Sequence, residues 1–144
     1  MRIAARLLES LWLGSGVFIL IAAPAIFRAA GSPTVAANVV GAVLTRWHYI
    51  SLLVPVLLLV LEWRNVRAPV VALLFAAIVL ASAQALVDVR IRAIRASSTV
   101  AISDLPREDP VRRRFGMMHG ISSLLLVAQV LAAAAVCVVA PRES

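Results

Sequence analysis

Long uncharged stretches divide the chain into four apolar segments. No Asp, Glu, Lys or Arg occurs in residues 11–27, 47–61, 68–87 or 115–140. A helix needs about 20 mainly apolar residues to cross the roughly 30 Å of hydrocarbon in a bilayer. With their flanks included, the segments predict four membrane-spanning helices, at residues 7–28, 38–62, 69–90 and 115–140.

Proline and capping residues mark where helices begin. Ser32-Pro33 and Asp109-Pro110 each place a capping side chain before a proline at the first helical position, where a missing N–H costs nothing. Both pairs therefore predict helix starts. Pro24 lies inside the first apolar segment, where it predicts either a kink or the end of the helix.

The first apolar segment has a second interpretation, as a secretory signal peptide. Arg2 and Arg6 precede it, and small residues surround Pro24 near its end. A retained span is favoured because the apolar run is long for a signal peptide and a proline stands where cleavage would fall.

The largest polar segment, residues 91–114, separates the third and fourth spans. Its first part alternates apolar and basic residues, so we expect the third helix to continue as an interfacial extension to about Ala96. Arg92 and Arg95 would then reach towards lipid head groups. The rest of the segment predicts a short surface loop.

Composition supports a membrane protein. Of the 144 residues, 62% are hydrophobic and only 15% are charged, and the mean hydropathy is +0.99. Such a chain is too apolar for an ordinary soluble domain, and strand-like alternation is absent. We therefore predict an all-α integral membrane four-helix bundle that forms a single transmembrane domain over residues 1–144.

The positive charge is carried by arginine alone. The net charge is +7, with 14 arginines and no lysine. Nucleic-acid binding is excluded because no water-exposed face interleaves basic with aromatic and polar residues. We expect the arginines to contact anionic lipid head groups at the membrane surface, so the predicted partner is the bilayer.

The distribution of arginines predicts the orientation. With four spans, one side of the membrane carries Arg2, Arg6, Arg64, Arg67 and Arg142. The other, arginine-rich side carries Arg28, Arg46, Arg90, Arg92, Arg95, Arg107, Arg112, Arg113 and Arg114. Because cytoplasmic loops carry the excess of basic residues, the 91–114 loop is predicted to be cytoplasmic.

The same topology predicts a polar cluster at the arginine-rich end. Helices two and four begin there and helices one and three end there, so polar residues that are distant in sequence meet. The predicted members are Arg46, His48, Tyr49, Gln84, Asp88, His119, Ser122 and Ser123. Polar groups at membrane depth are costly unless they face the bundle and pair, so an inward-facing cluster is expected.

Several roles remain open for this cluster. It can be a structural hydrogen-bond network, a proton relay, or a gate built from Asp88 and Arg46. His48 and His119 are also candidate ligands for a haem or a transition metal, although no spacing of His or Cys fixes such a site. We predict no cofactor and no enzymatic activity, because no Ser-His-Asp arrangement, phosphate-binding loop or pair of inward carboxylates is present.

Small residues predict close helix contacts. Gly14, Gly16, Gly116 and Gly120 lie in apolar segments, and the last two form a Gly-x-x-x-Gly pair. Such pairs let helices approach closely in lipid. We expect contacts within the chain, with a homo-oligomer seam as the alternative.

Several short segments of the chain together resemble a known protein family. Four segments are similar in type and order to the DUF4149 family, which is related to the transmembrane protein 205 family. They are Leu11-Trp12-Leu13-Gly14, Ala23-Pro24-Ala25-Ile26-Phe27, Val40 to Arg46, and the Arg-x-Phe-Gly-x-x-His-Gly-x-Ser pattern of residues 113–122. The matching positions are Trp12, Gly14, Pro24, Phe27, Gly41, Arg46, Phe115, Gly116, His119 and Ser122. His48 departs from the family, in which that neighbourhood is more often tyrosine-rich.

The resemblance implies a four-helix integral membrane protein, expected in the bacterial inner membrane. Vertebrate relatives are linked to platinum-drug resistance, which suggests transport or handling of a small solute or a metal-containing compound. Two alternatives stay open: an accessory subunit packed against a larger membrane complex, and a haem- or metal-binding electron-transfer subunit. A transporter should contain a cavity lined by Arg46, Asp88 and His119, whereas an accessory subunit should be filled solid.

Overall fold

The protein folds into long α-helices. The computed structural model describes residues 2–62 and 67–140, and in these residues there are four α-helices, one short 3-10 helix and no strand. The elements are α1 (Arg2–Ala29), α2 (Pro33–Glu62), α3 (Ala68–Ala96), η1 (Ile102–Asp104) and α4 (Pro110–Val139). The predicted all-α class is confirmed. Arg64 and Arg142, which contribute to the predicted orientation, lie outside the described residues.

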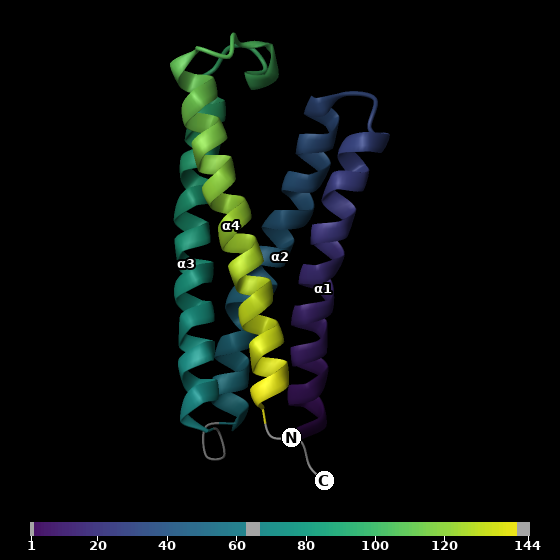
Figure 1. The fold of residues 1–144 in the computed structure, drawn as a ribbon, viewed down its shortest axis with the longest axis vertical. Helices are drawn as coiled ribbons and strands as arrows, with labels where there is room; N and C mark the ends of the chain where they lie inside the picture. The colour runs from purple at the N-terminus through teal and green to yellow at the C-terminus, as the bar shows by residue number, and fades with distance from the viewer. Residues whose placement is uncertain (1, 63–66, 141–144) are drawn as a thin grey trace.

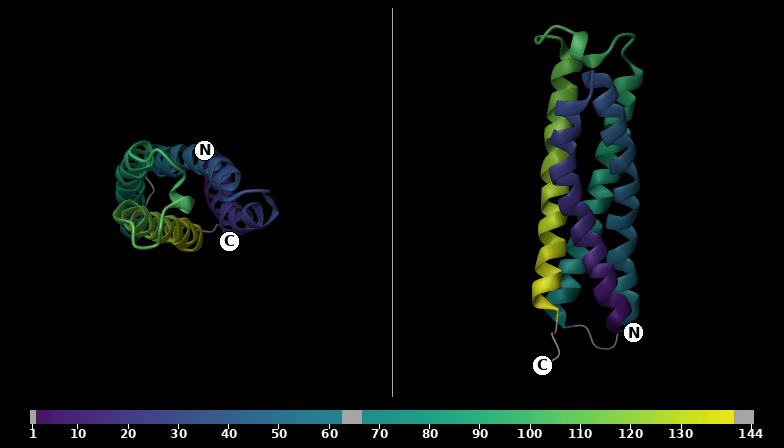
Figure 2. Two further views of the ribbon diagram at one scale, coloured as in Figure 1. Left: turned by 90° about the horizontal axis from the view of Figure 1, so that it is seen from above. Right: turned by 90° about the vertical axis from the view of Figure 1, so that its right-hand side faces the viewer.

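The helices form a four-membered bundle in which each contacts its neighbours along the chain and α4 closes the ring against α1. The start of α1 and the end of α4 lie at one end, which we call the terminal end (Figure 1). At the opposite, arginine-rich end, α1 and α2 lean away from α3 and α4, and the segment containing η1 crosses above the opening (Figure 2).

The predicted helix starts are confirmed. Ser32 Oγ accepts a hydrogen bond from the Val35 amide at 3.2 Å, one turn into α2. Asp109 is the N-cap of α4, and its Oδ1 accepts from the Val111 amide at 2.7 Å. Pro24 does not end α1, which continues to Ala29. A bilayer helix tolerates proline because neighbouring groups compensate for the lost backbone bond.

All four helices are long and apolar enough to span a bilayer. They contain 28 to 30 residues, or roughly 42–45 Å at 1.5 Å per residue, and therefore extend beyond the predicted spans. The apolar stretch within each helix has a mean hydropathy of 1.7 to 2.5, yet only 17–33% of the residues in each stretch are buried. Large apolar side chains such as Leu86 and Leu124 instead cover the outer surface. The apolar outer surface is suited to lipid.

The core is concentrated towards the terminal end. Its largest fully buried apolar side chains are Trp12, Trp47, Leu58, Leu74 and Val136. Trp47 Nε1 donates to Ser15 Oγ at 3.1 Å, and Ser15 Oγ lies 3.1 Å from the Trp12 carbonyl, to which it donates. These bonds join α1 to α2 where the bundle is packed.

One of the four predicted contact glycines lies in a tight helix contact. A Cβ added to Gly16 would lie 2.7 Å from Val130 Cγ2 and 3.0 Å from Trp47 Cζ2. Gly14, Gly116 and Gly120 have no such neighbour within 4 Å. The prediction of intrachain contacts at these three is therefore wrong, because each lies on an exposed part of its helix, and Gly116 is beside an opening.

Candidate functional site

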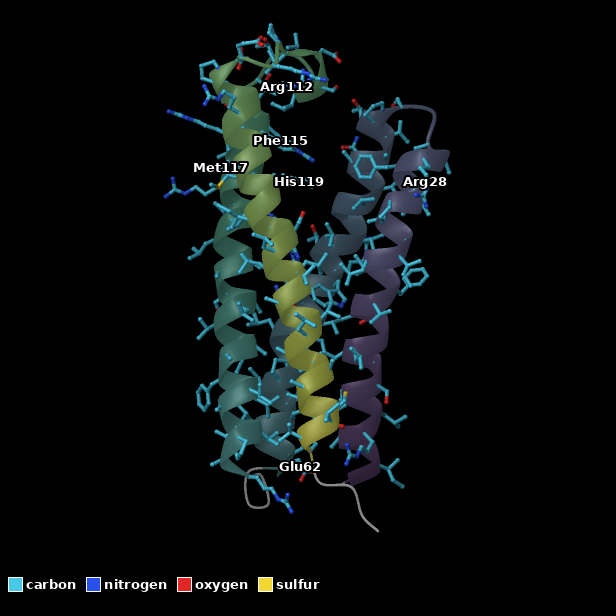
Figure 3. The ribbon with its side chains drawn as sticks, viewed as in Figure 1. Arg28, Glu62, Arg112, Phe115, Met117 and His119 are labelled. Atoms are coloured by element: carbon cyan, nitrogen blue, oxygen red, sulfur yellow. The ribbon has the colours of Figure 1, made fainter. Side chains whose placement is uncertain are left out.

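A crevice of about 820 Å³ opens between the diverging helices at the arginine-rich end. Residues of all four helices and of the 100–103 segment line it. Figure 3 shows Phe115 and His119 on the side of α4 that faces α2, whereas Met117 points away from the bundle. Pockets of about 300–1,000 Å³ are typical of small-molecule sites. The crevice is therefore large enough to hold a small ligand.

The wall formed by α2 is mainly apolar. Val40, Leu44 and His48 recur every four residues and so share the inward face of α2. Phe27, from the end of α1, adds an aromatic ring. The remaining residues of this wall are Pro33, Thr34, Ala37, Asn38, Gly41 and Thr45.

The facing wall, formed by α3 and α4, is basic and aromatic. From α3 it contains Asp88, Ile91, Arg92 and Arg95. From α4 it contains Arg112, Phe115, Gly116, His119, Ser122, Ser123 and Leu126. The two walls therefore differ strongly in polarity.

A hydrogen-bonded network forms the floor of the crevice. His48 Nδ1 lies 2.6 Å from Asp88 Oδ2, within ion-pair distance but without the geometry of a hydrogen bond. Gln84 is fully buried, and its Nε2 donates to Asp88 Oδ1 at 2.9 Å and to Ser122 Oγ at 2.7 Å. Three helices are joined by these contacts. The network lowers the cost of placing a carboxylate at membrane depth.

An aromatic stack stands above the floor. The rings of Phe115 and His119, one turn apart on α4, are parallel to within 4° with centroids 6.0 Å apart. The Arg95 guanidinium carbon lies 5.3 Å from the centre of the Phe115 ring, which is the geometry of a cation–π contact. Arg95 is therefore held against the α4 wall of the crevice.

Arg112 fastens the segment that crosses the mouth. Its Nη1 donates to the Ser103 carbonyl at 3.1 Å and also to the Leu105 carbonyl. Val100, Ala101, Ile102 and Ser103 consequently form part of the lining. The connection between α3 and α4 is thus tied down at the edge of the crevice.

Of the predicted polar cluster, the structure brings six residues together and leaves two outside. His48, Gln84, Asp88 and Ser122 form the floor, and His119 and Ser123 lie on the adjoining wall. Arg46 and Tyr49 are exposed, and Arg46 donates to the carbonyl of Ala42 on its own helix.

The inward placement predicted for Arg46 and Tyr49 is therefore wrong. At 100° per residue, Arg46 lies nearly opposite His48 on α2, and Tyr49 lies about a quarter turn away. Shared depth in the membrane does not bring a side chain to the inward face.

Arg92 and Arg95, which are predicted to reach towards lipid head groups, both line the crevice. Their spacing from Asp88, by four and seven residues, puts all three on one face of α3. This spacing is the signal that identifies the basic wall from sequence.

Both histidines predicted as metal or haem ligands line the crevice, on opposite helices. His48 Nδ1 lies beside Asp88, and both ring nitrogens of His48 are buried without a hydrogen-bond partner. Within residues 2–62 and 67–140, no three His, Cys, Asp or Glu side chains are grouped as a metal site requires. Ligation by His48 and His119 stays the alternative to the prediction of no cofactor.

These features define a small multi-pass integral membrane protein with a crevice at one end of its bundle. Comparison of the chain with protein-family models, curated proteins and solved structures finds no match. Membership of the DUF4149 family therefore stays a prediction. Several residues that carry that resemblance line the crevice: Phe27, Gly41, Phe115, Gly116, His119 and Ser122.

Proposed function

We propose that the protein binds a small solute in the crevice and handles it from the arginine-rich side of the membrane. The observation that carries this proposal is the crevice itself, with a volume of about 820 Å³ and with Asp88 and His119 in its lining. An accessory subunit that only packs against a partner needs no such space. Arg46, the third residue expected in a transport cavity, does not contribute.

The crevice has the form of a binding site closed on one side. Below His48 the bundle contains the fully buried side chains of Trp12, Leu58 and Val136. A solute that crossed the membrane would have to displace this packed core, which requires the helices to move. The proposal is therefore binding and handling with helix movement, without an open pore and without enzymatic chemistry.

If the chain belongs to the DUF4149 family, metal-containing compounds are candidate solutes, and the bacterial inner membrane is the proposed location. The proposed orientation places the 91–114 loop in the cytoplasm. The binding proposal depends on neither assignment, since it rests on the crevice.

Cysteine labelling tests whether water and solutes enter the crevice. In a Cys137→Ser background, Ser123→Cys places a thiol in the lining, and Leu124→Cys places one on the outer surface at the same depth. In lipid vesicles, a water-soluble, membrane-impermeant thiol reagent should modify the first and not the second. If Ser123→Cys is unreactive from both sides, the proposed function is contradicted.

A thermal-stability screen of the purified protein tests binding directly. Neutral, anionic, cationic and metal-containing solutes are compared on the wild type and on Gly116→Trp. Gly116 lines the crevice and has free space around its Cα, so the indole should fill the site without disturbing the core. At least one solute class should stabilise the wild type and not the filled variant. Equal effects on both proteins would contradict binding in the crevice.

A further inference from the structure

The charge of the crevice is concentrated on one wall, near its mouth. On α3, Arg92 and Arg95 lie one and two turns beyond Asp88, about 6 Å and 10 Å further along the helix. The other charged or titratable groups of the lining are His48, His119 and Arg112. Three guanidinium groups thus face a space that contains a single carboxylate.

Arg92 and Arg95 retain their capacity to bind an anion. In the described part of the chain, neither guanidinium forms a salt bridge or a hydrogen bond. Arg112 differs, because it is engaged with backbone carbonyls of the 97–109 connection. The stack of Arg95 on Phe115 fixes the guanidinium in the crevice and leaves its N–H groups free.

The carboxylate of the floor is already engaged within the bundle. Asp88 lies within ion-pair distance of His48 and accepts from Gln84, and Gln84 also donates to Ser122. Both ring nitrogens of His48 and Gln84 Oε1 form no hydrogen bond, but these atoms are buried. The anion-binding capacity that remains is therefore at the mouth.

The opposite wall is suited to hydrocarbon. Ala37 and Leu44 of α2 and Phe27 of α1 present apolar surface on the wall across from the arginines, and Thr34, Asn38 and Thr45 add uncharged polar groups there. A fully hydrated anion would leave this surface in contact with water, whereas an acyl chain would cover it. The helices are longer than the hydrocarbon layer, so the arginines lie where lipid head groups lie.

We propose that the ligand is a single-chain amphipathic anion, with its phosphate or carboxylate held by Arg92 and Arg95 and its hydrocarbon chain against the α2 wall. This inference rests on the proposed function and names the substrate class. Bidentate guanidinium binding selects the head group, and the apolar wall selects for the chain.

Equilibrium binding of radiolabelled dodecyl phosphate to the purified protein in maltoside micelles tests the substrate class. Unlabelled dodecyl phosphate should displace the label, whereas dodecanol and inorganic phosphate should compete at least about tenfold less well, since each lacks one half of the contacts. Equal competition by inorganic phosphate would overturn the requirement for a chain. Equal competition by dodecanol would overturn the requirement for a head group.

Matched arginine variants locate the head group. Arg92→Gln/Arg95→Gln should weaken dodecyl phosphate binding at least about tenfold, because it removes the two unpaired guanidinium groups. The control, Arg113→Gln/Arg114→Gln, removes the same charge from exposed positions of α4 outside the lining and should leave binding within about twofold. Equal loss in both variants would show attraction to the basic end in general and overturn the assignment.

A second pair of variants locates the chain. A Cβ added at Gly41 would have no atom within 4 Å, and a leucine side chain at this position would extend from the α2 wall into the crevice. Gly41→Leu should therefore weaken the binding of dodecyl phosphate. Gly120→Leu, on an exposed position outside the lining, should not. Dodecyl phosphate could fail to bind while Ser123→Cys is labelled and another solute stabilises the protein. That result would contradict the amphipathic anion as the ligand and leave the proposed function in place.

Discussion

His48 of α2 and Asp88 of α3 hold the crevice together at its floor, with His48 Nδ1 2.6 Å from Asp88 Oδ2. Both side chains are largely buried, at 14% and 20% exposure. Beyond this floor the same two helices carry the apolar and the basic walls. The pair therefore fixes the separation of the two walls at the narrow end of the crevice.

A double-mutant cycle should reveal this coupling. His48→Ala and Asp88→Ala each leave a buried polar partner unpaired, so we expect a coupling energy of about 1–3 kcal/mol. The free energies of unfolding can be measured in mixed micelles of maltoside and dodecyl sulfate. Strict additivity of the two single changes would contradict a direct interaction.

The close approach at Gly16 should make that position intolerant of any side chain. Gly16→Ala places a methyl group 2.7 Å from Val130 Cγ2, so the Val130 side chain or α1 must shift, with an expected loss of about 1–3 kcal/mol of stability. Gly14→Ala is the control, because it has open space and alanine favours the helix. Equal stability of the two variants in the same unfolding assay would refute the tight contact.

Two adjacent serines should differ in their contribution to stability. Ser122 accepts from Gln84 of α3, whereas Ser123 donates to the His119 carbonyl within its own helix. Ser122→Ala should cost about 1 kcal/mol, the net value of one such bond, and Ser123→Ala should cost less. Thermal unfolding in detergent distinguishes them. A larger loss for Ser123→Ala would contradict the network.

Labelling in intact cells should resolve the orientation. In a Cys137→Ser background, a membrane-impermeant reagent added outside should label Arg67→Cys, at the start of α3, and leave Ser103→Cys unlabelled until the cells are opened. This follows from the excess of arginine on the side of the 91–114 loop. The opposite pattern would reverse the proposed orientation.

Much of the fold could be predicted because the signals are local. The Asp109 side chain starts α4 by accepting from the nearby Val111 amide, and the length of an apolar run that spans the membrane is set by the thickness of the bilayer. The predicted cluster contains all four residues of the floor, but it also includes Arg46 and Tyr49, which face outwards. His48 and Arg46 lie at nearly the same depth, but the rotation of α2 directs one towards the crevice and the other away from it.

The glycines illustrate the same limit. Gly16 and Gly14 look equivalent in the sequence, yet only Gly16 meets a neighbouring helix, through Trp47 and Val130. Whether a small residue lies at a contact depends on which face of its helix is covered, and this follows from the packing of all four helices. Sequence patterns identify the small residues, but the packing of the helices determines which of them lie at a contact.

Local patterns in the sequence are enough to predict four apolar helices, the first residues of α2 and α4, and the concentration of arginine at one end, because hydropathy, capping and charge are properties of neighbouring residues. The divergence of the helices at that end, the inward direction of Arg92 and Arg95, and the crevice between a basic and an apolar wall appear only in the folded bundle. These features depend on the rotation and tilt of each helix, which are set by side chains that meet across the bundle.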